Sequence, residues 1–148
     1  MKKFLPITIF AFLIIFANVA HAEKSEVEEL YDTLQVGKAA FTATDDYANI
    51  VNKELYAVAV SRIVSYRATA KAMRGVFNST PEGSPKRCAW LADAIIAERV
   101  AALESYIKYA ECWSIGDAKG CEFYSSQVAY SCNRAIKLRN DFFNKYRM

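Results

Sequence analysis

The sequence predicts an all-α protein, an antiparallel bundle of about four helices, and two observations carry this prediction. Only three prolines occur in 148 residues, and two of them, Pro81 and Pro85, fall in one short stretch. Most glycines after residue 22 lie near that stretch or in residues 116–120. Between these breakers run long alanine-rich segments in which apolar residues recur every three to four positions, which is typical of amphipathic helices.

The first 22 residues have the layout of a secretory signal peptide. A basic start at Lys2 and Lys3 precedes an apolar run over residues 4–17, and small residues stand at Ala20 and Ala22. This order of charge, apolar core and small residues is what the export machinery and signal peptidase recognise. The apolar run is shorter than the about 20 residues that span a bilayer. We therefore expect cleavage after Ala22 and a single, soluble helical domain over residues 23–148, located in the periplasm or secreted.

The first two helices of this domain are expected from capping residues and spacing. Ser25 with Glu28 three residues later forms a capping-box pattern, so the first helix should begin there. Thr44 is the expected N-cap of a second helix that runs to about Arg74. A merger of the two helices across Gly37 is the alternative. The apolar stripe expected for the first helix is Val27, Leu30, Tyr31, Leu34 and Phe41.

The last two helices are expected to form a hairpin. A loop over residues 75–86 separates them from the second helix, and the third helix should cover residues 87–113. The short turn over residues 116–120 forces the fourth helix to return antiparallel beside the third. The expected buried stripe of the fourth helix is Tyr124, Val128, Cys132, Ala135, Leu138 and Phe142.

Four cysteines, Cys88, Cys112, Cys121 and Cys132, follow the signal segment. An even count in an exported chain predicts two disulfides that staple the bundle. Cys112 and Cys121 flank the turn at the same level, so we pair them. Cys88 and Cys132 are left to each other, although the hairpin separates them by about 20 Å along its axis, which requires a bend or a late helix start. A zinc site is one alternative, but close Cys-x-x-Cys pairs are missing. Free thiols that act as small core residues are the other alternative.

Histidine chemistry is excluded by composition. His21 is the sole histidine and leaves with the signal peptide, so nucleophilic pairs with histidine and histidine metal sites cannot form. We predict no metal, no cofactor and no catalytic residue. Glu104 and Glu111 lie about 10 Å apart on one helix, which is wider than the roughly 5–9.5 Å of two-carboxylate hydrolases. With Lys108 between them, they indicate a solvated salt-bridge face, and a carboxylate hydrolase is the least favoured alternative.

Aromatic residues gather around the predicted hairpin turn. Nine tyrosines occur, all after residue 22. Tyrosine and tryptophan give large, rigid contact area at low entropic cost, which suits binding to a protein. Core packing is the alternative for aromatic residues at helical spacing. The candidate partner-binding residues are Tyr106, Tyr109, Trp113, Tyr124 and Tyr130.

Charge gives little support to a nucleic-acid partner. The signal segment removes two of 19 basic residues and none of the 16 acidic ones, so the exported chain is close to neutral. Its last helix nevertheless ends basic, which complements the helix dipole or forms a patch for an anionic lipid, wall polymer or acidic partner. These basic residues are Arg134, Lys137, Arg139, Lys145 and Arg147.

The sequence therefore predicts an exported, bacterial-type helical protein that binds a protein partner and is not an enzyme. An inhibitor or immunity protein that plugs a target through the loop over residues 75–86 or the turn near Gly116 is the specific form we expect. The alternative is an envelope structural or adaptor protein that binds wall or lipid. The partner, the host and the oligomeric state are not defined by the sequence.

Overall fold

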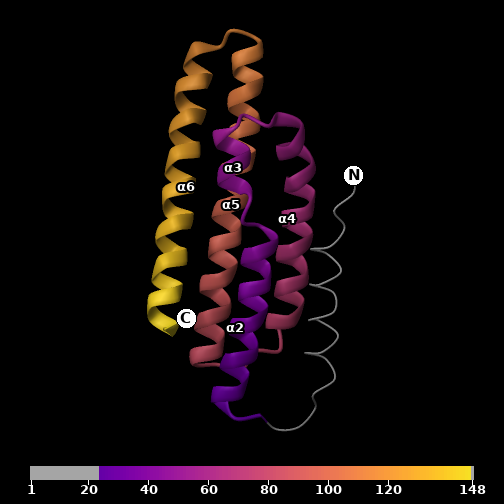
Figure 1. The fold of residues 1–148 in the computed structure, drawn as a ribbon, viewed down its shortest axis with the longest axis vertical. Coiled ribbons are helices and arrows are strands. Elements are labelled where there is room, and N and C mark those ends of the chain that lie inside the picture. Colours follow the sequence, from indigo (N-terminus) through magenta and orange to yellow (C-terminus); the bar gives the residue numbers. More distant parts are fainter. Residues whose placement is uncertain (1–23, 148) are drawn as a thin grey trace.

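The computed structural model describes residues 24–147, and this part of the chain is all-helical (Figure 1). Four long helices form an elongated bundle together with one short helix. They are α2 (Glu26–Ala43), α3 (Tyr47–Asn52), α4 (Tyr56–Phe77), α5 (Ser84–Ser114) and α6 (Ala118–Tyr146). The predicted all-α bundle is confirmed, with no strand in the described residues. The predicted signal peptide and its cleavage site lie outside them. Within residues 24–147, no helix combines the length and apolarity needed to cross a membrane.

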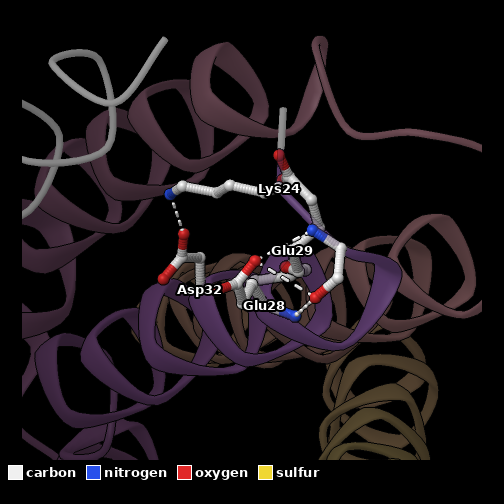
Figure 2. Close-up of polar contacts among 6 residues, drawn as sticks. Lys24, Glu28, Glu29 and Asp32 are labelled. Carbon is white, nitrogen blue, oxygen red and sulfur yellow. Dashed lines mark hydrogen bonds and ion pairs between the residues drawn. The ribbon is translucent and has the colours of Figure 1, made fainter. Parts of the chain in front are cut away.

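Helix α2 begins where the sequence predicted (Figure 2). The Glu28 amide donates to Ser25 Oγ at 3.3 Å, and the Ser25 amide donates to Glu28 Oε2 at 2.9 Å. These two bonds form the capping box. Lys24 pairs with Asp32 on the next turns. The Ser84 amide donates to Glu26 Oε1 at 3.3 Å, so the start of α2 is tied to the start of α5.

The prediction of one helix from Thr44 to Arg74 is wrong. Thr44 ends α2, because its fully buried hydroxyl has no access to water and donates to the Ala40 carbonyl at 2.9 Å. After the short α3, Glu54 adopts a left-handed conformation with φ of 53°, which interrupts the helix between α3 and α4. The predicted separation of the first two helices is confirmed, but the second is divided into α3 and α4.

The remaining helices are longer than expected. Helix α4 reaches Phe77 and α5 begins at Ser84, so the loop is shorter than the predicted residues 75–86. Pro85 fits in the first turn of α5, where its missing amide hydrogen costs no helical bond. Helix α6 begins at Ala118, inside the predicted turn, because Asp117 caps it by accepting from the Gly120 amide at 2.9 Å. The antiparallel return of α6 along α5 is confirmed.

The core consists of two groups of buried side chains. The Phe142 cluster joins α2, the end of α4, the start of α5 and the end of α6. Its buried members are Val36, Ala40, Phe41, Ala70, Met73, Phe77, Cys88, Ala89, Ala92, Ile95, Ile96 and Phe142. The Tyr66 cluster joins α3, the start of α4 and the middle of α5 and α6. Its buried members are Tyr47, Ile50, Ala59, Ile63, Tyr66, Ala102, Leu103, Tyr106 and Ala135.

The helical stripes predicted from spacing are confirmed in part, more fully for α6, where the other four stripe residues are half-buried, than for α2. Ala135 and Phe142 of α6 are buried, whereas Val27 and Tyr31 of α2 are 76% and 61% exposed. Helix α2 turns a different face inward, with Gly37 in its centre. A Cβ at Gly37 would lie 3.5 Å from Phe142 and Ala92 side-chain atoms, which is ordinary contact. Gly37 therefore lies where α2 packs against Ala92 of α5 and Phe142 of α6, with room for one methyl group.

A buried arginine connects the two clusters. Arg99 of α5 is 1% exposed, and its guanidinium lies over Phe41 of one cluster and Tyr47 of the other, at 5.7 and 5.0 Å from the ring centroids. Its Nη1 donates to the Phe41 carbonyl at 2.8 Å and to Thr44 Oγ1 at 2.7 Å. The arginine thereby satisfies the backbone where α2 ends.

The predicted disulfides are not found. All four cysteines are free thiols, and no two lie at disulfide distance in the described residues. Cys88 belongs to the Phe142 cluster, while Cys132 packs against the Tyr66 cluster. Tyr146, near the end of α6, packs against the same cluster as Cys88. Since Tyr146 is 14 residues from Cys132, or about 21 Å along α6, the axial separation foreseen from the sequence rules out this pair.

The Cys112–Cys121 pair is also absent, because the two side chains take different directions across the hairpin. Cys112 Sγ lies 2.5 Å from the position that a Cβ of Gly120 would occupy. The Cys121 thiol lies 4.0 Å from the carbonyl oxygen of Tyr109, one turn further into α5. The hairpin is therefore held by packing between its helices.

Candidate functional site

The closed end of the α5–α6 hairpin, residues 107–130, is the part of the bundle that the other helices do not cover (Figure 1). We call it the hairpin tip. The last buried residue of α5 is Tyr106, and the first buried residue of α6 is Ser131. At the base of the tip, Ile107, Tyr109 and Val128 still pack against the Tyr66 cluster. Beyond them, no residue from 107 to 130 is fully buried.

Three large apolar side chains of the hairpin tip face solvent. Trp113 is 72% exposed, Ile115 is 79% exposed and Phe123 is 57% exposed. Leaving such side chains in water forfeits burial energy of about 1.5–3 kcal/mol each. Exposed apolar groups gathered at one place on a soluble protein are typical of an interaction site. The tip is therefore the candidate binding surface.

The five aromatic residues predicted as partner contacts divide into three groups. Tyr106 is 4% exposed and belongs to the Tyr66 cluster, so the structure places it in the core. Tyr109 and Tyr124 are half-buried, and Tyr124 packs edge-on against Phe123 with ring centroids 5.0 Å apart. Trp113 and Tyr130 are exposed. The Tyr130 hydroxyl accepts a bond from Arg134 Nη1 at 3.3 Å, which orients this ring along α6.

Two exposed tip residues were missed at the sequence level, Ile115 and Phe123. Ile115 lies directly after α5 beside the turn, and as an aliphatic residue it is not part of the aromatic pattern. Phe123 is adjacent to Tyr124 on α6 and lies outside the helical stripe through Tyr124 and Val128. The signal that could have found both is their position within a few residues of Gly116, beyond the reach of any third helix.

The turn of the hairpin tip has a defined geometry. Gly116 adopts φ of 73°, which favours glycine. A Cβ at Gly120 would lie 2.3 Å from Asp117 Oδ2 and 2.5 Å from Cys112 Sγ, so any side chain here would displace these two groups. Burial and the neighbouring Asp117 carboxylate raise the pKa of the Cys112 thiol, which keeps it protonated at neutral pH. The exposed apolar side chains are thus presented on a compact, fixed turn.

The acidic residues considered for catalysis lie in surface ion pairs. Glu104 pairs with Arg67 of α4, and Glu111 pairs with Lys108 at 3.0 Å. Each carboxylate is 44–46% exposed in its side chain. They face different partners, which agrees with a solvated, charged face. Among residues 24–147, no group of three or more histidine, cysteine or acidic residues is arranged to hold a metal ion.

A second exposed tryptophan lies near the opposite end of α5. Trp90 is 68% exposed and lines a hollow of about 170 Å³ between the ends of α4 and α5. Arg74 and Asp93 cross this hollow as an ion pair at 2.9 Å. Because Trp90 and Trp113 belong to one helix and have similar exposure, they form a matched pair for testing which end binds.

Comparison with known proteins gives no relative. No protein-family model matches the chain, and neither the curated proteins nor the solved structures contain a significant match. The function must therefore be argued from the geometry of this chain.

Proposed function

We propose that this chain is an exported helical protein that acts by binding a protein partner through its hairpin tip, in the manner of an inhibitor or immunity protein. The observation that carries the proposal is the exposure of Trp113, Ile115 and Phe123 at the uncovered end of the bundle. A projecting apolar end fits a concave surface, such as the cleft of an enzyme. Export rests on the signal-peptide layout of residues 1–22.

Two physical properties of the tip support the proposal that its exposed apolar side chains form a binding surface. The turn is fixed by the Asp117 cap and by the left-handed Gly116, so little conformational entropy is lost when a partner binds. Tryptophan is also enriched among the residues that dominate protein interfaces. The proposal includes no catalytic step, and the ion-paired state of Glu104 and Glu111 supports this part of it.

The test is affinity capture from envelope extract of the host with the exported protein as bait. We expect one stoichiometric partner, identified by mass spectrometry. Trp113→Ala should weaken its binding by about tenfold or more, since an interface tryptophan contributes about 2 kcal/mol. The matched control is Trp90→Ala, which removes an equally exposed indole from the other end of α5 and should leave affinity unchanged.

Three outcomes contradict the proposal. An equal loss of affinity with both substitutions would indicate nonspecific adhesion. A loss of affinity with Trp90→Ala alone would indicate that the partner binds near the loop between α4 and α5. Recovery of lipid or wall material without a protein would favour an adaptor role. Mass spectrometry of the native protein tests export separately, because a chain that begins at Glu23 shows cleavage, whereas an intact Met1 contradicts it.

A further inference from the structure

A pocket of about 240 Å³ lies between the end of α2 and the last turns of α6. The pocket lies near the end of α6 that is opposite the hairpin tip. The proposed function makes no use of it. Its lining residues are Lys38, Phe41, Thr42, Asp45, Arg139 and Phe143. The two phenylalanine rings lie 6.2 Å apart at an angle of 62° and form an apolar wall. The polar residues stand around this wall.

The cations of the pocket lack carboxylate partners. Lys38 and Arg139 are exposed, and neither makes an ion pair with a carboxylate in the part of the chain that the structure describes. The Arg139 guanidinium lies over the Phe143 ring, 4.6 Å from its centroid. This contact holds the charge against the apolar wall, where water screens it less than in bulk solution.

The third positive charge lies behind the wall. Arg99 is 1% exposed, contacts the Phe41 ring, and has Nη2 3.9 Å from Asp45 Oδ1. The Asp45 side chain is 72% exposed, so it compensates this buried charge poorly. Arg99 Nε has no hydrogen-bond partner in the described residues. Since a buried charge without full compensation is unfavourable, an anion placed nearby is stabilised by Arg99.

We propose that this pocket binds a small organic anion, a carboxylate or phosphate monoester with an aromatic or other apolar body. The anionic head lies between Lys38 and Arg139, and the body rests against Phe41 and Phe143. Asp45 is the one carboxylate against three cations, so the local charge remains positive. The wall accounts for a preference for an aromatic anion over inorganic phosphate.

The experiment is isothermal titration calorimetry of the full exported chain with 3-phenylpropionate, phenyl phosphate and the neutral 3-phenylpropanol. At least one anion should bind with a Kd of about 1 mM or tighter, and the alcohol at least about tenfold more weakly. The stronger of the two anions identifies the head group. Amide NMR shifts should be confined to residues 38–45 and 139–143.

The variants are Arg139→Gln and the matched control Lys137→Gln, which removes the same charge from an exposed position on the same helix. Arg139→Gln should weaken binding about tenfold and Lys137→Gln by less than about twofold, because only Arg139 lines the pocket. No saturable binding of either anion, equal binding of the alcohol, or equal effects of the two variants would overturn the proposal. Trp113→Ala should leave anion binding unchanged, so this test is independent of the hairpin tip.

Discussion

Helices α5 and α6 behave differently in their two halves. In the body of the molecule they pack against α2, α3 and α4, and residues such as Ile96 and Phe142 are fully buried. In the hairpin tip the same two helices have only each other, and Trp113 and Phe123 remain in solvent. A two-helix hairpin can cover one face of each helix, so burial depends on a third helix. The apolar spacing continues into the tip, but the layer that would cover it is missing.

The largest contrast is expected between two phenylalanines of α6. Phe142→Ala should lower the free energy of unfolding by about 3–5 kcal/mol, because it leaves a cavity in the Phe142 cluster. Phe123→Ala should change it by less than about 0.5 kcal/mol, because the ring is mostly solvated. Urea denaturation followed by circular dichroism measures both. A similar loss for the two variants would show that the tip is covered in solution.

Alkaline pH should lower the free energy of unfolding through two groups in the body of the bundle, Cys88 and Tyr146. Burial raises the pKa of the Cys88 thiol to about 12, against a smaller opposing effect of the Tyr146 hydroxyl, while an unfolded thiol titrates near 9. The folded state therefore holds the proton more tightly, and this contribution is complete below about pH 9 and is lost as pH rises toward 12. The Tyr146 pKa is raised to about 12, chiefly by burial, and acts in the same direction.

Unfolding measured from pH 7 to 11 should show this decline, and Cys88→Ala should decline less steeply. The variant loses a buried sulfur and is less stable throughout, so the slope with pH is the relevant quantity. Equal slopes would contradict the assignment to Cys88. Cys121→Ala, which removes a half-buried cysteine of the tip, serves as the control.

Gly120→Ala should destabilise the protein by about 1 kcal/mol, since the added methyl displaces Asp117 and removes its cap on α6. The control is Gly75→Ala on α4, where a Cβ meets no atom within 4 Å. That substitution should stabilise the helix by about 0.5–1 kcal/mol. Thermal unfolding should show a lower melting temperature for Gly120→Ala and a higher one for Gly75→Ala. A combined Gly120→Ala and Cys112→Ala variant should recover part of the loss if crowding is the cause.

The last prediction concerns the rates at which the cysteine thiols react in the native protein and involves no change in stability. Cys112 and Cys121 are half-buried in the tip, whereas Cys88 is fully buried. A thiol reagent added to the native protein should therefore modify a tip cysteine first and Cys88 only upon unfolding. Mass spectrometry of peptides identifies the order. Four unreactive sulfurs that become reactive only with reductant would restore the disulfide hypothesis.

A local signal predicted the start of α2 correctly, but a similar signal at Thr44 did not predict a helix start. The capping box at Ser25 and Glu28 is contained within four residues, so it could be read directly from the sequence. Thr44 has the same cap-forming side chain, but it donates backwards to Ala40 because α2 ends in the core beside Arg99. Which direction a threonine bonds depends on burial, and burial is a property of the assembled helices.

The exposure of the five candidate contact residues was predicted only in part. The turn near Gly116 located the tip, and Trp113 and Tyr130 are exposed as expected. Tyr106 could not be distinguished from them, because the boundary between body and tip is set by where α3 ends and α4 begins. The pocket beside Arg139 brings together residues about 100 positions apart, and no local pattern reveals it.

The capped start of α2 also bears on the proposed export. Cleavage after Ala22 would leave Glu23 and Lys24 ahead of the Ser25 cap, and Lys24 is paired with Asp32. The same helix start is tied to α5, because the Ser84 amide donates to Glu26. If the proposed cleavage takes place, we expect it to precede closure of the bundle, and a chain folded beforehand should resist processing.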